Sequence, residues 1–175
     1  MSHSFPKSLA AALLMAACSS LPVLAKPSST LVSFRAAQAD KGRHITAAPK
    51  GGLILGSKVL TNKEVFTLID LNGGALKSGD AVQISYDSGD RPSYWRESKG
   101  KIARTAEKPD AASTFKAIWK QPGVSLMLRS PGGRFVSGPG KGQPIALIAK
   151  AGAPTTIFTL VKNPKPTKVV RKKAA

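Results

Sequence analysis

The chain has 175 residues, with 27 Lys and Arg against 9 Asp and Glu, so its formal net charge is +18 and anionic partners are expected. Its single cysteine excludes an internal disulfide framework, so the fold must be held together by a hydrophobic core. A domain of about 150 residues is large enough, because it buries about 68–70% of the surface of its unfolded chain.

Residues 1–25 have the layout of a bacterial export signal. Lys7 supplies the positive charge, and a nine-residue apolar run covers residues 9–17. That run is too short to span a hydrocarbon layer of about 30 Å. Val23-Leu24-Ala25 then offers small residues for cleavage. We therefore predict that residues 1–25 are a cleaved signal peptide and that the protein is exported, to the periplasm or outside the cell.

A second interpretation of this segment stays open. Leu14-Met15-Ala16-Ala17-Cys18 fits a loose lipobox, in which Cys18 would be lipidated and become the new N-terminus. The protein would then be an outer-membrane lipoprotein. Met15 is a weaker choice than Leu at its position, so simple cleavage is the preferred prediction.

A similar six-residue segment occurs three times after residue 25, and each copy ends one of the units described below. It contains a Phe followed by small, polar and apolar residues, and the successive Phe residues are 49 and 43 positions apart. Spacings of this size indicate repeated supersecondary units. The three copies are Glu64–Ile69, Ser113–Ile118 and Thr156–Val161.

Each Phe closes a unit with the same order of expected strands. The first strand alternates apolar and polar residues, which is typical of a half-buried strand. Turns with Gly or Asp separate the later strands, because these residues tolerate tight turns. The first three strands of the units are 32–35, 43–46 and 51–55, then 82–86, 94–97 and 100–103, then 126–129, 134–137 and 143–147. With the closing strands, this makes about twelve.

Three four-strand units predict an all-β fold, specifically a β-trefoil of three four-strand repeats at about residues 31–71, 80–119 and 123–162. The domain as a whole is placed at residues 26–163. The alternative is a sandwich of three unrelated β segments. The shared order of elements in the units favours the trefoil.

The chain also resembles the fascin-like family of trefoil repeats, over roughly residues 30–163. The family pattern is an apolar strand ending in Arg, a Gly-basic-aromatic-Val turn and a closing Phe-x-Leu. The second unit diverges, with Tyr94-Trp95 in the turn. The resemblance implies a trefoil fold and says little about function. It rests on Val124–Ser130, Gly133–Ser137 and Phe158–Leu160 in the third unit, and on Phe34–Ala37, Gly42–Ile45 and Phe66–Leu68 in the first.

The positive charge is unevenly distributed. All nine acidic residues lie between Asp40 and Asp110, whereas residues 111–175 contain twelve Lys and Arg and no acid. We predict a flexible basic tail over residues 164–175. The alternative is that the charge serves solubility alone. The expected polyanion-binding residues are Arg134, Lys141, Lys162, Lys165, Lys168, Arg171, Lys172 and Lys173.

A second candidate site lies in the loop of the second unit, which is rich in aromatic and charged residues. Sugar sites pair an aromatic face with groups that bind hydroxyls, and this loop contains both kinds. The resemblance to lectin-like trefoils implies the same location. Trp95 is expected to fill the barrel, as Ile45 and Val136 would, and Trp119 to lie in the core or at a barrel end. The proposed ligand-binding residues are Tyr86, Asp87, Asp90, Arg91, Tyr94 and Arg96.

Catalytic signatures are weak throughout the sequence. His44 is the one histidine beyond the predicted signal, and one His without Cys cannot build a structural zinc site. His44 is expected to pack, since it occupies the position of Tyr94 and Phe135. Asp87 and Asp90 flank a turn and are poor candidates for paired hydrolytic carboxylates. We expect no enzyme activity, no catalytic residue, no metal and no cofactor.

These patterns predict an exported, non-catalytic binding module, a monomer by itself, that recognises carbohydrate or an anionic envelope polymer. Acidic polysaccharide, anionic lipid, lipopolysaccharide and extracellular DNA are the anions available outside the cytoplasm. The alternative is a protein-interaction or structural component of the cell envelope, a class that includes inhibitor-type trefoils.

Overall fold

The computed structural model describes residues 25–38, 40–89, 91–106 and 108–167. The predicted signal peptide therefore lies outside the described residues, apart from Ala25. Within the described residues the chain forms twelve strands and four short 3-10 turns and is all-β, as expected. The strands are β1 (Ser28–Ala36), β2 (Ile45–Ala47), β3 (Leu53–Leu55), β4 (Phe66–Asp70), β5 (Ala81–Asp87), β6 (Pro92–Ser98), β7 (Lys101–Ala106), β8 (Phe115–Gln121), β9 (Ser125–Arg129), β10 (Phe135–Ser137), β11 (Ala146–Ile148) and β12 (Phe158–Lys162).

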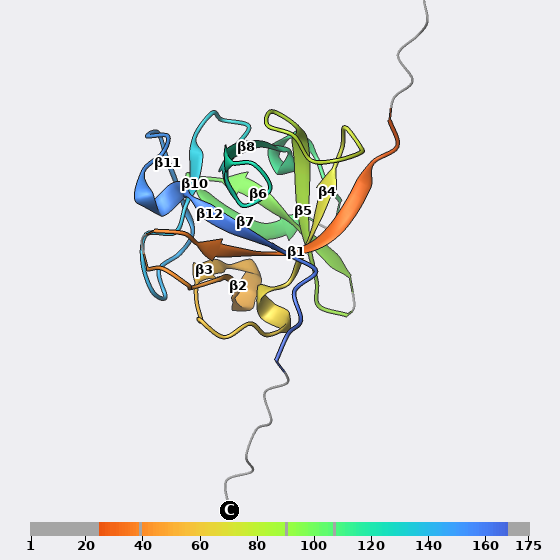
Figure 1. Cartoon of the computed structure of the whole chain (residues 1–175). Helices are drawn as coiled ribbons and strands as arrows, with labels where there is room; N and C mark the ends of the chain where they lie inside the picture. Colours follow the sequence, from red (N-terminus) through yellow and green to blue (C-terminus); the bar gives the residue numbers. More distant parts are fainter. Residues whose placement is uncertain (1–24, 39, 90, 107, 168–175) are drawn as a thin grey trace, which may run out of the picture.

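The main sheet closes on itself. Nine strands follow one another in the order β10-β11-β7-β6-β5-β4-β1-β12-β9, and β9 pairs back to β10. The extra strand β8 pairs with both β9 and β5, on opposite sides of the ring. Figure 1 shows the strands wrapped around a common centre, with the described chain entering at the upper right and ending at the bottom. Closure leaves no long free strand edge in the barrel.

This pairing corrects the predicted β-trefoil of three four-strand repeats. The strands form a closed nine-strand barrel with one extra strand, and their pairing does not divide clearly into three four-strand repeats. In the first unit, β2 and β3 form a separate two-stranded sheet, which is joined to the third unit by isolated bridges from Ile54 to Pro144 and from Leu55 to Lys141. In the third, β11 pairs across to β7 of the second. Hydrogen bonds between units therefore decide the architecture, and a recurrent sequence pattern does not specify them.

The recurrent Phe positions do play equivalent packing parts. Phe66, Phe115 and Phe158 are each 0–1% exposed in the main core cluster, and Phe34 of β1 is buried with them. Trp95 is fully buried beside them, with its ring 5.2 Å from that of Phe34 and 5.1 Å from that of Phe66. The prediction that Trp95 fills the barrel is confirmed, and Ile45 and Val136 are fully buried as well.

A short turn precedes each closing Phe strand. The 3-10 turns Asn62–Glu64, Ala111–Ser113 and Pro154–Thr156 lead into β4, β8 and β12. Each ends in a buried polar residue two positions before the Phe, and the first turn is closed by a capping box between Thr61 and Glu64. The local pattern of the three repeated endings is thus reproduced.

His44 is a packed residue, as expected. It is 6% exposed, and its Nδ1 lies 2.7 Å from the Ser33 hydroxyl oxygen. Burial lowers the pKa of His44 below its ordinary 6.5, and the nearby Arg35 lowers it further, while Glu64 opposes both. Protonation of this ring therefore opposes folding.

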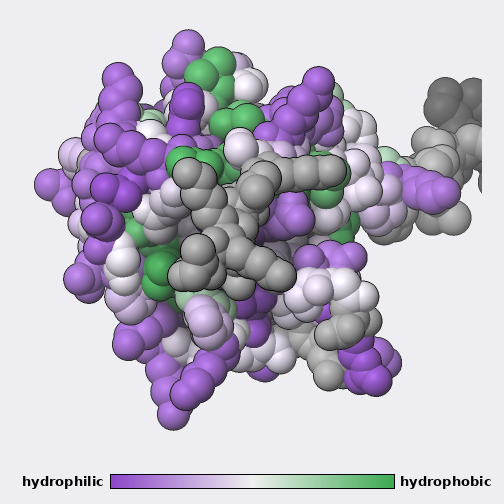
Figure 2. Space-filling model, turned by 90° about the horizontal axis from the view of Figure 1, so that it is seen from below, coloured by the Kyte–Doolittle hydropathy of each residue, from purple (hydrophilic) through white to green (hydrophobic). Residues whose placement is uncertain are grey.

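The outer surface is mainly hydrophilic. Figure 2 views the molecule from below, and purple hydrophilic residues dominate this face while green hydrophobic residues form separate spots. Among the described residues the exposed large hydrophobic side chains are Leu31, Val59 and Val124.

Candidate functional site

The acidic side chains of the described residues are used inside the protein. All seven of them accept hydrogen bonds from the chain itself, mostly from backbone N–H groups of turns. Their negative charge is therefore committed to holding loops in place. They are Asp40, Glu64, Asp70, Asp80, Asp87, Glu97 and Asp110.

The lysines behave differently. Among the described residues, Arg43, Arg96 and Arg134 form ion pairs, whereas no lysine forms one. Ammonium groups without a carboxylate partner produce a positive field around the molecule. The described surface is consequently suited to anions.

Two cations without a carboxylate partner among the described residues lie close together in one groove of the surface. Lys116 of β8 faces Arg129 of β9 in the antiparallel register, and both residues are exposed. Like charges at directly opposed positions destabilise a strand pair. The two cations line a groove of about 300 Å³ together with Thr114, Ser130 and Gly133, and no carboxylate lies in its described lining.

Arg129 is held in a defined orientation in this groove. Its Nε donates a hydrogen bond to the carbonyl oxygen of Gly133 at 3.1 Å. Gly133 has a φ of 83°, a conformation that favours glycine, so the turn brings its carbonyl back toward β9. The remaining guanidinium nitrogens and the Lys116 ammonium group could hold one sulfate, phosphate or carboxylate group between them.

Arg134, a predicted polyanion-binding residue, has a partner within the fold. Its Nη2 donates to Glu97 Oε1 at 2.9 Å, and the backbone N–H of Gly132 donates to Glu97 Oε2 at 2.9 Å. Burial acts to raise the pKa of Glu97. The bonds from Arg134, Gly132 and the neighbouring Ser130 outweigh burial, and the pKa is lowered from 4.5. Glu97 thus joins β6 to the turn before β10.

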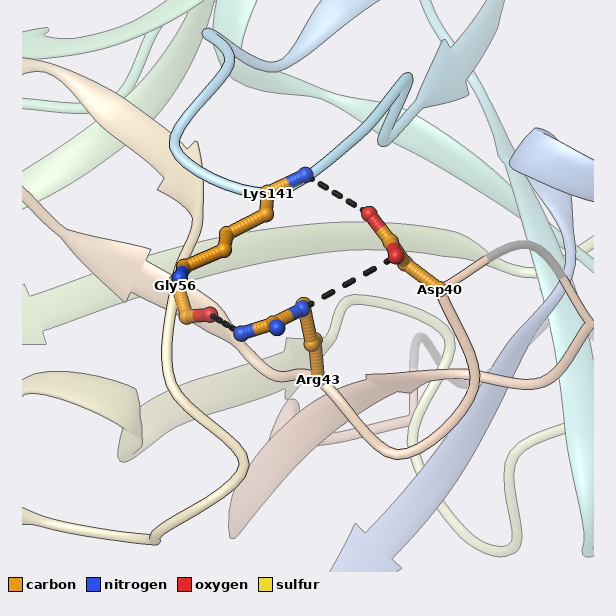
Figure 3. Close-up of polar contacts among 4 residues, drawn as sticks. All are labelled: Asp40, Arg43, Gly56 and Lys141. Atoms are coloured by element: carbon orange, nitrogen blue, oxygen red, sulfur yellow. Dashed lines mark hydrogen bonds and ion pairs between the residues drawn. The ribbon is translucent and has the colours of Figure 1, made fainter.

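Lys141 lies at a second such contact, shown in Figure 3. Its backbone N–H donates to Asp40 Oδ2 at 2.6 Å, while Asp40 Oδ1 lies 3.9 Å from Arg43 Nε. Arg43 also donates to the carbonyl oxygen of Gly56 at 3.0 Å. The backbone of Lys141 is therefore fixed by Asp40, and its exposed side chain remains available to a ligand.

The structure gives Tyr86 a role inside the fold. Its ring lies 5.8 Å from that of Phe66, and the guanidinium carbon of Arg104 lies 4.5 Å from its centroid. Arg104 is held there by a 2.6 Å hydrogen bond to the carbonyl oxygen of Ala48, and its burial lowers its pKa. One face of Tyr86 is thus covered by a cation.

The two tyrosines of the predicted sugar site do not form one platform. Tyr86 pairs with Ser93 and Tyr94 pairs with Ser85 across β5 and β6. Neighbouring residues of a strand point to opposite faces, so Tyr86 and Tyr94 lie on opposite sides of this ribbon.

The charged members of that loop are separated as well. Asp87 Oδ1 accepts from the N–H of Gly89 at 2.8 Å, and Arg96 pairs with Asp110 at 3.0 Å. Arg91 is exposed and has contacts of its own. Asp90 lies outside the described residues. The structure therefore brings no aromatic–carboxylate pocket together from the described members of this set.

The start of the predicted tail lies against the barrel. The N–H of Asn163 donates to the carbonyl oxygen of Leu31, and the N–H of Thr167 donates to that of Leu60, both at 2.8 Å. Lys162 and Lys165 are exposed. The other predicted tail cations, Lys168, Arg171, Lys172 and Lys173, lie outside the described residues.

Lys116 and Arg129 were not among the binding residues predicted from the sequence. The two residues belong to different predicted units, and neither stands in a run of basic residues. The signal that could have found them is the register of the hairpin between them, since Gly123 is the natural turn. Only the observed pairing shows that the two cations face each other.

Comparisons with known proteins concern the fold. No family model and no curated relative matches the chain. The designed 3-fold symmetric protein ThreeFoil matches with a TM-score of 0.58 and 13% identity, over 75% of this chain and 97% of that one. The SDF2-like protein from Arabidopsis thaliana matches with a TM-score of 0.57 and 11% identity, over 81% of this chain and 98% of that one. Both are trefoil-like structures, so the chain shares a trefoil-like arrangement without showing their family.

Two other kinds of functional feature are absent from the part of the chain that the structure describes. Within the described ranges, no helix has the length and hydrophobicity needed to cross a membrane. Among the same residues, no three His, Cys, Asp or Glu side chains are grouped closely enough to hold a metal ion.

Proposed function

We propose that the protein is an exported, non-catalytic binding module that captures an anionic polysaccharide of the cell envelope. The observation that carries this proposal is the division of charge. Every described carboxylate is bonded within the fold, while no described lysine is paired with one. Such a surface attracts any polyanion.

The groove between β8 and β9 supplies the most defined contact. Lys116 and Arg129 are forced together by the register, and the bond from Arg129 to Gly133 limits the freedom of the guanidinium group. A pre-positioned cation loses less entropy on binding than a free one. In this proposal the groove holds one acidic group of the polymer, and Lys141, Lys162, Lys165 and the basic residues beyond Thr167 add electrostatic attraction.

Several parts of this proposed function rest on the sequence alone. Export rests on the predicted signal at residues 1–25, and the absence of catalysis on the weakness of the catalytic motifs. Membership of the fascin-like family is likewise a proposal, supported by the motifs of the first and third units and by the trefoil-like neighbours.

The test is binding to alginate, hyaluronan, double-stranded DNA and anionic lipid vesicles. Salt near 50 and 300 mM should be compared, because the Debye length falls from about 10 Å near 0.1 M toward 3 Å at 1 M. We expect binding to the acidic polysaccharides that weakens with salt. The double variant Lys116→Gln/Arg129→Gln should weaken it at least tenfold, which corresponds to about 1.4 kcal/mol.

The matched control is Lys58→Gln/Lys63→Gln, which removes the same charge from two exposed positions outside the groove. It should weaken binding much less than the groove variant does. Equal losses in the two variants would show that net charge, rather than the groove, holds the polymer. If the protein binds neither alginate nor hyaluronan, the proposal is wrong.

One observation favours the alternative of an envelope protein-interaction component. Leu31 is 51% exposed and lines a groove of about 310 Å³ with Val65, Pro164 and Pro166. Asn62, Thr67 and Asp87 add polar groups to the same lining, and a groove that combines exposed apolar side chains with polar ones suits a protein partner. Recovery of one defined envelope protein, lost on Leu31→Asp and retained in high salt, would favour this alternative.

A further inference from the structure

A second cavity lies away from the basic groove, where the ends of several strands meet. It is lined by residues from the start of β1, the end of β4, the following loop, β8 and the end of β12, and its volume is about 160 Å³. If one water occupies about 30 Å³, this space is larger than a single buried water and smaller than a drug-sized pocket of about 300–1,000 Å³.

Asp70 is the unusual residue of this cavity. It is 2% exposed, and its Oδ1 accepts from the N–H of Asn72 at 2.9 Å. Its Oδ2 is also buried and has no hydrogen-bond partner in the protein. A buried acceptor without a partner is costly, so a donor is expected to complete the site.

Trp119 provides the aromatic side of the cavity. Its Nε1 donates to the carbonyl oxygen of Leu76 at 3.1 Å, and its backbone N–H donates to Ser78 Oγ at 3.2 Å. The half-buried indole is therefore held in one orientation.

The remaining lining is divided between apolar and polar groups. Val32, Leu68 and Leu160 supply a hydrophobic part, while Ser28 and Thr30 supply hydroxyl groups and Lys162 supplies a cation. An apolar surface with a few convergent polar groups is the usual composition of a small-molecule site.

We propose that this cavity binds a single neutral sugar ring, such as the end residue of a glycan. A ring hydroxyl would donate to Asp70 Oδ2, and the apolar face of the ring would lie against Trp119. The strongly positive charge of the chain disfavours a cationic donor. This site is independent of the basic groove, because its ligand carries no charge.

The test is titration of the protein with glucose, galactose, mannose and N-acetylglucosamine, followed by NMR of the two tryptophan indole N–H groups. Trp119→Phe assigns the two signals. At least one sugar should shift the Trp119 signal and leave that of the core residue Trp95 unchanged. Because the ligand is neutral, the shift should persist at high salt, unlike polyanion capture.

Asp70→Asn is the decisive variant, because it replaces the free acceptor with an amide and retains an oxygen for the bond from Asn72. Binding should weaken at least tenfold. Asp40→Asn is the matched control, since Asp40 also accepts a hydrogen bond from a backbone N–H group, that of Lys141, and lies outside this cavity. If Asp70→Asn does not fold, Thr30→Leu narrows the cavity without altering the carboxylate and should produce the same loss.

Three results would overturn the proposal. Absence of any shift of the Trp119 signal across the four sugars would mean that the cavity holds water. A loss of binding in Asp87→Asn with none in Asp70→Asn would place the sugar in the loop of the second unit. Binding of glucosamine without binding of glucose would show that Asp70 selects an ammonium group rather than a hydroxyl.

Discussion

The surroundings of the two tryptophans differ in almost every respect. Trp95 is 0% exposed between Phe34 and Phe66, and its Nε1 has no hydrogen-bond partner. Trp119 is half-buried beside a cavity, and its Nε1 is bonded to Leu76. In the core, aromatic packing outweighs the cost of leaving the Trp95 N–H group without a partner. At the barrel end, the Trp119 N–H group is hydrogen-bonded and the ring borders a cavity. The same residue type packs the core in one region and, in our proposal, contacts a ligand in the other.

The largest effect on stability is expected from truncating each tryptophan to alanine. Trp95→Ala should lower the free energy of unfolding by about 3–5 kcal/mol, because it leaves a cavity in a close-packed core. Trp119→Ala should cost less than half as much, since its ring already borders empty space. Urea denaturation followed by circular dichroism measures both. Equal losses would mean that the barrel end is as tightly packed as the centre.

The contrast between enclosed and open groups extends to the ion pairs. Glu97 is 15% exposed at its side chain and accepts from both Arg134 and Gly132, whereas Asp110 and Arg96 are each 43% exposed. Glu97→Ala should cost about 1 kcal/mol, because it removes the carboxylate that accepts from Arg134 and Gly132, and both donors can turn to water instead. Asp110→Asn should cost about 0–1 kcal/mol.

The pH dependence sharpens the same comparison. The pKa of Glu97 is lowered in the folded state, so its stabilisation is present above 4.5 and is lost as pH falls through the folded pKa. Acid titration of stability in the parent protein and in Glu97→Gln should therefore differ below pH 4.5. Parallel curves would contradict an internal role for this carboxylate.

The smallest expected effect concerns His44. Because burial lowers its pKa, the unfolded chain binds a proton more readily than the folded one as pH falls below 6.5. The parent protein should lose stability through that range. His44→Gln should show a flatter dependence, measured as melting temperature against pH. An unchanged slope would indicate that the folded protein tolerates the charged ring.

Much of the secondary structure could be predicted from alternation and turn residues. The expected strands at 82–86, 94–97 and 126–129 lie within β5, β6 and β9. The strand expected at 143–147 is displaced, because β11 covers Ala146–Ile148 and Pro144 instead makes an isolated bridge to Ile54. Proline lacks the N–H that a regular ladder position requires.

The candidate site was less predictable. The aromatic loop of the second unit suggested a sugar pocket, yet Tyr86 packs under Arg104 and Tyr94 lies on the other face of the ribbon. Residue types in a loop do not reveal which strand faces they occupy when the register is unknown. Asp70, in turn, is an ordinary strand-end acid in the sequence.

The sequence by itself determined the all-β class, the excess of positive charge and the recurrence of a Phe strand at the end of each unit, because periodicity and composition are local properties of the chain. Tertiary structure alone decided that β9 closes on β10, that Lys116 faces Arg129, and that Asp70 lies buried beside Trp119 at a cavity. These relations join residues from distant segments through backbone pairing and packing. No local pattern encodes such contacts, since the same side chains would suit several registers and several orders of strands.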